Sequence, residues 1–239
     1  MKLHYVHEWP PTKHKAIDIQ RDVAAKIKLH GNTDDPKLIA AVDTAYGFGG
    51  EKLYASAVVL SFPQLEEVER VYHFDRVTFP YFPGLFYFRE GPIMVQALAK
   101  LESDPDLIIV HGHGTAHPQR CGIACHVGLD FDKPTVGCAR RLLVGTHRPV
   151  PDLKGGQQPI MHKGREVGIA YRTKDKVKPL FISPGHLCDL NYSRDILVRC
   201  LRGFRLPEPL RIAHLLANKY KRKMEKGNRP KTPRSPEPS

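Results

Sequence analysis

The sequence predicts an α/β fold in which a mixed β-sheet carries helices on its faces. Three segments rich in β-branched and aromatic residues come early in the chain, and strand-like and helix-like segments then alternate. The 239 residues are 41% hydrophobic and 26% charged, a composition typical of a globular protein with a substantial core. Collagen-like, coiled-coil and wholly disordered chains are excluded.

The expected strands are short runs of apolar residues. The first three suit an antiparallel meander, because Gly49-Gly50 and a polar segment around Gln64 separate them. Later strands are separated by helical segments, which favours buried parallel neighbours. The expected strands are 38–42, 53–60, 68–74, 106–110, 135–138, 167–172 and 179–182.

The expected helices have apolar residues at helical spacing, such as Ile19, Val23 and Ile27 in the first. No repeat or internal linker divides them, so we expect residues 1–224 to form one domain. The expected helices are 15–28, 89–101, 121–131, 193–201 and 209–220.

The charge of the chain points to a polyanionic partner. Its 37 Lys and Arg exceed its 25 Asp and Glu, for a formal net charge of +12. Half of this excess lies from Lys219 onward, where eight basic residues face two acidic ones. We expect residues 225–239, rich in Pro and basic residues, to be a disordered tail. It is either a solvated end or a nonspecific contact with nucleic acid or another partner.

Neither a membrane span nor a disulfide framework is expected. The longest apolar runs, such as 107–110, are far shorter than the roughly 20 residues of a membrane helix. The first residues lack the apolar stretch of a secretory signal. The 5 cysteines lie within apolar patterns, which suits reduced, buried thiols. We therefore expect a cytoplasmic protein, with a monomer as the default.

Two expected strands lead directly into residues that bear chemistry. Residues 38–42 run into Asp43, and 106–110 run into His111. If these strands are parallel neighbours, their terminal side chains lie within about 5 to 7 Å of each other. Glu90, at the start of the helix between them, can turn toward the same point. Carboxylates facing a basic surface suit metal-assisted phosphodiester hydrolysis.

Each of these residues also has a purely structural interpretation. Asp43 after a strand suits a turn or cap, and Glu90 in the first turn of a helix is favoured by the helix dipole alone. The histidines and cysteines of segment 111–126 show no repeated pair at the spacing of a structural zinc site. Spacing by itself therefore leaves a structural and a catalytic interpretation open.

Five longer strings run in order through most of the chain. They are PYFPGLFYFREGP (80–92), HGHGTAHPQRCGIACHVG (111–128), PTVGCARRLL (134–143), SPGH (183–186) and LPEPLRIAH (206–214). Together they closely resemble the endonuclease V family. The resemblance implies a ribonuclease H-like fold and a DNA-repair endonuclease that recognises deoxyinosine in DNA or inosine in RNA. It further implies hydrolysis of the second phosphodiester bond on the 3′ side, with 3′-hydroxyl and 5′-phosphate products and a requirement for Mg²⁺ or Mn²⁺.

The resemblance also implies the metal ligands. Asp43 matches the first metal-binding aspartate of the family, and Glu90 matches the glutamate of its REGP segment. The second aspartate belongs to a segment that usually reads V-D-G-H-G, where this chain has His111. Neutral imidazole suits Mn²⁺, Zn²⁺ or Fe better than Mg²⁺. We therefore expect Asp43, Glu90 and His111 to hold Mg²⁺, with Mn²⁺ preferred.

Two further positions bear on catalysis. The lysine usual after the G-C-A segment is Arg140 here, which keeps the charge but loses the compact ammonium. His214 matches a histidine at the edge of the active site, where we expect it to position a proton or water. The substitutions at His111 and Arg140 leave two alternatives: an active nuclease with altered metal preference, and an inosine- or nucleic-acid-binding protein with impaired catalysis. A regulatory or RNA-processing role of the tail is a third.

The resemblance places substrate recognition on an aromatic side chain and on glycines. Tyr81 lies between Pro80 and Pro83 and matches the family's wedge, since proline restricts the backbone that holds the ring. The alternative for Tyr81 is an aromatic core residue. The glycines that resemble those shaping the pocket for an extruded base are Gly84, Gly112, Gly114 and Gly137.

His117, Arg120 and Lys163 are candidates for phosphate contacts or for plain surface positions. The pocket glycines do not report contacts to a 2′-hydroxyl, so DNA and RNA both remain open as substrates.

Overall fold

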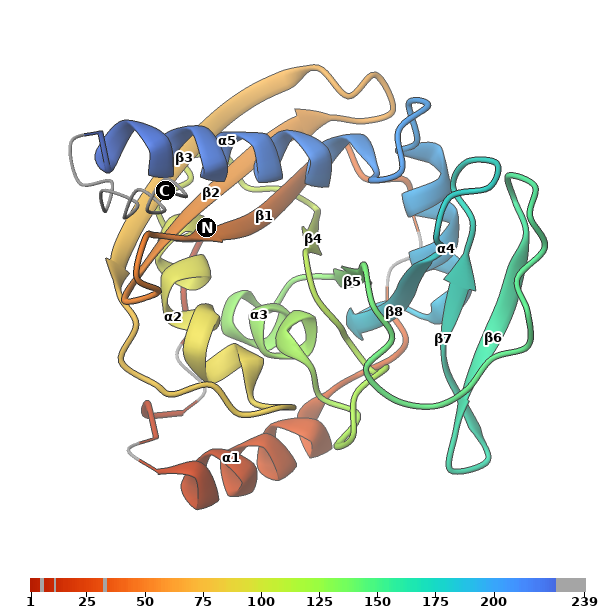
Figure 1. Ribbon diagram of the computed structural model, residues 1–239, viewed down its shortest axis with the longest axis horizontal. Coiled ribbons are helices and arrows are strands. Elements are labelled where there is room, and N and C mark those ends of the chain that lie inside the picture. Colours follow the sequence, from red (N-terminus) through yellow and green to blue (C-terminus); the bar gives the residue numbers. More distant parts are fainter. Residues whose placement is uncertain (5–6, 11, 32–33, 227–239) are drawn as a thin grey trace, which may run out of the picture.

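A single mixed sheet runs through the centre of the molecule (Figure 1). The computed structural model describes residues 1–4, 7–10, 12–31 and 34–226. The strands are β1 (Leu38–Tyr46), β2 (Lys52–Ser61), β3 (Glu67–Arg76), β4 (Leu107–Val110), β5 (Thr135–Ala139), β6 (Gln157–His162), β7 (Arg165–Tyr171) and β8 (Leu180–His186). The helices are α1 (Lys13–Lys26), α2 (Phe86–Leu98), α3 (Ile123–Phe131), α4 (Leu190–Arg199) and α5 (Glu208–Met224).

The order of the strands is β3-β2-β1-β4-β5-β8-β7-β6. β1, β2 and β3 form the predicted antiparallel meander, whereas β1, β4 and β5 run parallel. From β5 onward the pairing is again antiparallel, between β5 and β8, β8 and β7, and β7 and β6. All four residues of β4 are fully buried, as expected for a central strand covered on both faces.

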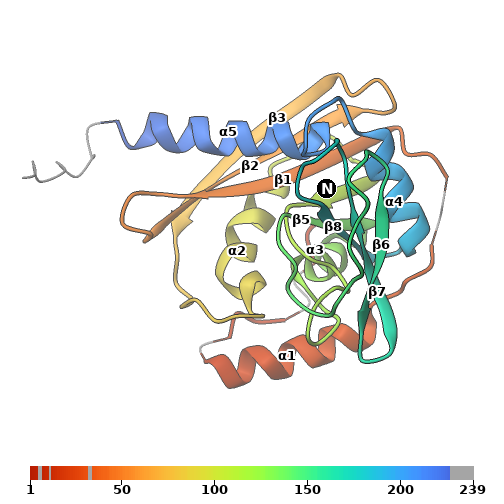
Figure 2. The same ribbon diagram turned by 45° about the vertical axis from the view of Figure 1, so that its right-hand side comes forward.

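Helices cover both faces of the sheet, which confirms the predicted architecture. The buried side chains of α1, α2 and α3 form one core with β1, β2 and β4, and those of α4 and α5 form another with the opposite faces of the same strands. Figure 1 shows α5 lying along the meander with α1 far from it, and Figure 2 shows the same separation from a second direction. No helix among the described residues combines the length and the apolarity that a membrane crossing requires.

The structure corrects two strand predictions. β1 does not end before Asp43 but continues to Tyr46, because its antiparallel partner β2 pairs with it along the whole length, through Tyr46 opposite Leu53. β6 was missed, since Pro159 and two glutamines obscure the strand pattern in its sequence. Proline is tolerated there because β6 is an edge strand.

The start of α2 was also predicted too late. The helix begins at Phe86, directly after a turn in which Gly84 has a φ of +82°, a conformation that favours glycine. Glu90 is therefore the fifth residue of α2. The helix dipole acts mainly on the first turn, so it does not explain an acidic residue at this position.

The end of α5 is fastened to the meander by a buried carboxylate. Glu225 accepts hydrogen bonds from the Phe48 amide at 3.0 Å and from the Tyr54 hydroxyl at 3.2 Å. The first residue of the predicted tail 225–239 thus belongs to the folded part, and residues 227–239 of that tail lie outside the described residues. All five cysteines are free and buried, as predicted.

Candidate active site

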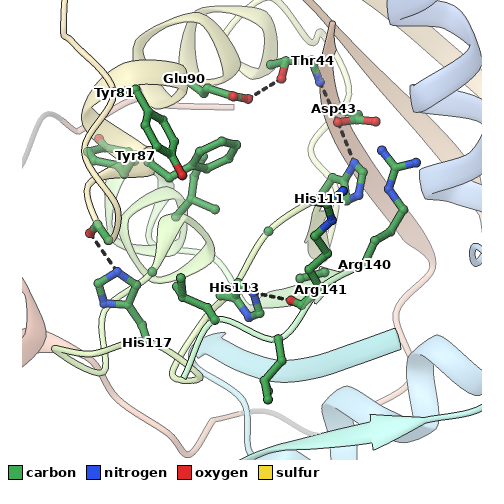
Figure 3. Close-up of a pocket in the computed structure, with 18 of the residues that line it drawn as sticks. Asp43, Thr44, Tyr81, Tyr87, Glu90, His111, His113, His117, Arg140 and Arg141 are labelled. Carbon is green, nitrogen blue, oxygen red and sulfur yellow. Dashed lines mark hydrogen bonds and ion pairs between the residues drawn. The ribbon is translucent and has the colours of Figure 1, made fainter. Parts of the chain in front are cut away.

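Asp43, His111 and His214 form a tight group at one end of a cleft. The Nδ1 atom of His111 lies 2.8 Å from Oδ1 of Asp43, and Nδ1 of His214 lies 2.8 Å from Oδ2. One potential metal-ligand atom from each residue lies within 4.8 Å of the others. Figure 3 shows Asp43 of β1 and His111, which directly follows β4, pointing toward each other.

The parallel pairing of β1 and β4 brings Asp43 and His111 together, as the sequence predicted. Val42 pairs with Val110, and the amide of His111 donates a hydrogen bond to the Val42 carbonyl at 3.2 Å. Asp43 lies on the same face of β1 as Ile39 and Ala41, the face covered by α5, which brings it to His214.

His214 arrives from a distant part of the chain. It lies on α5, which packs across β1 and β2 (Figure 1). The buried Ser56 hydroxyl donates a 2.6 Å hydrogen bond to the carbonyl of Ala213, the residue before His214. This contact holds α5 against β2 at the level of the site. His214, assigned only an assisting role from the sequence, is a full member of the group.

Glu90 lies beside this group but is not part of it. Its buried carboxylate accepts a hydrogen bond from the Thr44 hydroxyl (Figure 3). Burial, together with the negative charge of Asp43, raises the pKa of Glu90 to about 7, although the hydrogen bond from Thr44 opposes the increase. Glu90 can therefore exchange a proton near neutral pH.

The ionised form of Asp43 is stabilised by its neighbours. Burial by itself raises the pKa of a carboxyl group, but hydrogen bonds from His111 and His214 outweigh burial and lower the pKa of Asp43 below its usual value. The Thr44 amide adds a hydrogen bond to Oδ1 at 2.7 Å. Asp43 thus carries a negative charge in the cleft at neutral pH.

The donor set fits a divalent cation. Two imidazoles and one carboxylate suit Mn²⁺, Fe²⁺ or Zn²⁺ better than they suit Mg²⁺, because Mg²⁺ favours oxygen ligands alone. Two of the predicted ligands, Asp43 and His111, belong to the tight group, which also contains His214. The third predicted ligand, Glu90, lies beside it.

The cleft that contains this group has a volume of about 880 Å³. Its lining includes acidic residues at the metal-ligand end and basic residues further along. The basic lining residues are Arg140, Arg141, Lys178 and Arg205. Figure 3 shows Tyr81 and the Arg140–Arg141 pair on opposite sides of the cleft. The arrangement suits an anionic chain that crosses the metal-ligand group.

Tyr81 is the most exposed aromatic residue of the cleft lining, with 65% of its surface accessible. This exposure excludes the alternative of a core residue. Pro80 and Pro83 beside it are also exposed. Tyr81 therefore lies at the tip of a loop that projects into solvent.

Both ends of the Tyr81 loop are anchored by side chains. Arg89 donates to the Phe79 carbonyl at 2.8 Å, before the tip. After the tip, the Gly84 carbonyl accepts hydrogen bonds from Gln20 at 3.0 Å and from His117 at 2.8 Å. Gln20 also donates to the carbonyl of Cys121 at 3.0 Å. The backbone of the loop is thus fixed while its aromatic tip remains free.

His117, a candidate for a phosphate contact, lines the cleft but is engaged by the protein itself. His117 is only 3% exposed, and burial lowers its pKa to about 4. Its Nδ1 atom accepts a hydrogen bond from the Gln119 amide, so both ring nitrogens are engaged. Neutral and fully bonded, His117 anchors the Tyr81 loop instead. Arg120 is half-buried and Lys163 is exposed, and neither lines the cleft.

With the fold and cleft established, comparison with known proteins identifies the family. The sequence model of the Endonuclease V family matches residues 21–215. The chain belongs to the Endonuclease V family. An Endonuclease V of Roseiflexus sp. (strain RS-1) is 42% identical over 210 residues, which cover 88% of this chain and 94% of the relative. An Endonuclease V of Gloeobacter violaceus is 42% identical over 216 residues, with coverages of 89% and 88%.

Solved structures of the Endonuclease V family have the same fold. The Bacillus subtilis protein superimposes with a TM-score of 0.89 at 30% identity and covers 96% of this chain and 100% of its own. Endonuclease V from Ciona intestinalis, solved with a 24mer DNA that contains an inosine followed by a ribo-adenosine, gives a TM-score of 0.78 at 26% identity, with coverages of 89% and 98%. The predicted ribonuclease H-like fold and nuclease class are confirmed.

The predicted pocket glycines of this Endonuclease V family member divide into two pairs. Gly84 and Gly112 line the cleft, as predicted. Gly114 and Gly137 do not line it. A Cβ on Gly114 would lie 2.0 Å from the Pro184 carbonyl oxygen, and one on Gly137 would lie 2.5 Å from the Gly114 nitrogen. These two glycines allow β5, β8 and the 111–114 segment to pack closely.

Several residues of the Endonuclease V cleft were missed from the sequence. Gln20 shares the apolar face of α1 with Ala16 and Val23, and a polar residue on such a face is a signal for a buried hydrogen bond. Thr44 directly follows Asp43 but has no recognisable motif of its own. Arg205 has no local signal, because only the tertiary fold brings it to the cleft.

Proposed function

We propose that this chain is a metal-dependent endonuclease that recognises inosine or deoxyinosine and hydrolyses the second phosphodiester bond on the 3′ side. The observation that carries the proposal is one cleft that combines the Asp43–His111–His214 group, basic residues and the exposed Tyr81. The inosine-containing DNA bound by the Ciona intestinalis relative supports the substrate class. The five buried free cysteines support a reducing, cytoplasmic compartment.

Asp43, His111 and His214 are the residues that would hold the metal. When bound, a divalent cation lowers the pKa of water and stabilises the leaving oxygen in phosphodiester hydrolysis. Asp43 supplies the anionic ligand, and Glu90, with its pKa of about 7, accepts or returns a proton beside it. Arg140 offers a fixed positive charge to a phosphate at the cleft wall.

Tyr81 fits the wedge that recognition of an extruded base requires. An exposed ring on an anchored loop fills the gap beside an unstacked base at little entropic cost. The inosine base pair is weak, so its extrusion costs less than that of an ordinary base. Gly84 and Gly112 leave backbone groups accessible in the cleft for the edge of the base.

A second candidate function is binding of inosine-containing nucleic acid without turnover. It is favoured by His111, which replaces an anionic oxygen ligand with a neutral nitrogen, and by Arg140, whose guanidinium does not release a proton. Both substitutions leave the Tyr81 loop and the basic lining intact.

A strand-cleavage assay tests both candidates. End-labelled duplex DNA and RNA, each with one inosine or with adenosine in its place, are incubated with Mg²⁺, Mn²⁺, Zn²⁺ or EDTA. We expect metal-dependent cleavage of inosine substrates at the second bond 3′ to the lesion, and the two nucleic acids reveal the preferred sugar. Binding without cleavage under every metal supports the second candidate, and equal cleavage of the adenosine controls overturns the substrate class.

A further inference from the structure

A second loop with an apolar tip faces the Tyr81 loop across the cleft. Residues 140–146 follow β5, and the first four read Arg140-Arg141-Leu142-Leu143. Leu142 is 37% exposed and Leu143 is 40% exposed, and both line the cleft. The two leucines are adjacent and line the cleft beside basic residues, so a ligand bound there would cover them.

This loop is anchored like the Tyr81 loop. Arg205 donates a hydrogen bond to the Arg140 carbonyl at 3.2 Å. Nε2 of the half-buried His113 donates to the Arg141 carbonyl at 3.0 Å (Figure 3). At the far end, Thr146 exchanges two backbone hydrogen bonds with Met161 of β6, at 3.0 and 2.9 Å. The backbone is therefore held at both ends while the leucine side chains remain exposed.

The charges around the leucines identify the ligand that fits them. Arg140 and Arg141 precede the leucines directly, and Lys178 and Arg205 line the same wall. The acidic lining residues, Asp43 and Glu90, belong to the metal-ligand end of the cleft. A ligand for this wall therefore combines an apolar surface with an anionic group.

We propose that Leu142 and Leu143 form a subsite for an unstacked nucleobase next to the base bound in the cleft, while Arg140 and Arg141 contact its phosphate. This inference rests on the proposed function, because it requires a nucleic acid in the cleft. A nucleotide has the required combination of a planar, weakly polar ring and an anionic phosphate. Leucine is among the apolar side chains that proteins insert beside bases in distorted nucleic acids.

The subsite gives the cleft two apolar contacts, one on each side. Tyr81 fills the gap beside the extruded base, and the leucine pair covers the neighbouring base, so the strand is kept from restacking. Because both loops are already anchored, little backbone conformational entropy is lost on binding.

The test compares the double variant Leu142→Ala/Leu143→Ala with Leu153→Ala. Leu153 is 70% exposed and does not line the cleft, so it controls for loss of a surface leucine. The probe is an inosine-containing oligonucleotide with the fluorescent base 2-aminopurine next to the inosine, titrated with protein and Mn²⁺. Thermal unfolding of all three proteins verifies that the fold is retained.

We expect the wild type and Leu153→Ala to change the 2-aminopurine emission strongly on binding. The double variant is expected to bind about tenfold more weakly, as loss of one base contact implies, and to lose most of the emission change. If the wild type prefers inosine but the double variant keeps the same affinity and the same emission change, the subsite is overturned and the proposed function is not. No preference of the wild type for inosine over adenosine would overturn the proposed function, and the subsite with it.

Discussion

The imidazole of His214 lies 2.8 Å from the carboxylate of Asp43, although 171 positions separate the two residues in the chain. His111 engages the other carboxylate oxygen at the same distance. Asp43 is thus the centre of a group that combines one carboxylate with two imidazoles. Which cation this group would favour depends on its composition, because each ligand type selects its own cations.

Replacing His111 with aspartate is expected to shift the metal preference toward Mg²⁺. The wild type should favour Mn²⁺ over Mg²⁺ more strongly than His111→Asp, by about tenfold, because a carboxylate restores a hard anionic ligand. Calorimetric titration with each metal measures the ratio without reference to activity, and nicking of a deoxyinosine duplex measures it in turnover. His30→Asp, at an exposed position, is the control. Equal Mn²⁺/Mg²⁺ ratios for wild type and His111→Asp refute this prediction.

Truncation of Tyr81 is expected to weaken discrimination more than general affinity. Tyr81→Ala should reduce the ratio of inosine to adenosine affinity by about tenfold, the size of one lost base contact. Competition binding with matched duplexes gives this ratio. Leu215→Ala, which removes an exposed residue outside the cleft lining, should leave it unchanged. If Tyr81→Ala weakens binding of the inosine duplex and of the adenosine duplex by the same factor, Tyr81 is not a wedge.

Gln20→Leu is expected to loosen the Tyr81 loop. The substitution keeps the volume but removes the donors to the carbonyls of Gly84 and Cys121, at a cost of about 1–3 kcal/mol in unfolding free energy. Inosine discrimination should fall as well, while Mn²⁺ affinity stays constant. Denaturant unfolding and competition binding measure the two effects. Asp22→Asn, on the exposed side of α1, is the control. If Gln20→Leu is destabilised but still discriminates inosine as well as the wild type, Gln20 does not position the Tyr81 loop.

His126 makes stability depend on pH. Burial lowers the pKa of His126 well below 6.5, so the unfolded chain takes up a proton there that the folded chain excludes. Neutral His126 therefore contributes fully to the free energy of unfolding above about pH 6.5. This free energy falls as the pH is lowered below that value. Neither ring nitrogen of His126 has a hydrogen-bond partner among the described residues.

His126→Phe is therefore expected to be more stable than the wild type. Phenylalanine keeps the stacking on Tyr87, whose ring lies 3.9 Å away between centroids, and removes two unpaired nitrogens. We expect a gain of about 1 kcal/mol at neutral pH and a larger gain at pH 5. Urea unfolding at several pH values measures it, with the exposed His30→Asn as control. A pH slope identical to that of the wild type would contradict the assignment to His126.

The folded domain is expected to end after Glu225. Glu225→Ala should cost about 1–3 kcal/mol, because it removes the acceptor for the Phe48 amide and the Tyr54 hydroxyl. A chain shortened after Lys226 should unfold at the same temperature as the full chain. Thermal unfolding of Glu225→Ala and of the shortened chain measures the two effects. A lower unfolding temperature of the shortened chain would show that the folded domain extends beyond Lys226.

The sequence was sufficient where chemistry follows from local pattern. Two apolar strands that lead into Asp43 and His111 predicted their meeting, because parallel neighbours align equivalent positions. The same reasoning placed the end of β1 too early, since it considered the apolar run and not the antiparallel partner that extends the strand. Glu90, the third predicted ligand, lies beside the Asp43–His111–His214 group, where its carboxylate accepts a hydrogen bond from Thr44.

The amino-acid sequence by itself determined the α/β class, the family resemblance and the residue types of the site, because these depend on periodicity and on short strings. Only the tertiary structure decided which of those residues act together. His214 joins Asp43 because α5 crosses β1 and β2. His117 bonds to the Gly84 carbonyl of the Tyr81 loop, and Leu143 lines the cleft from the opposite loop. Such contacts join segments far apart in the chain, and packing of the whole sheet and its helices is what sets them.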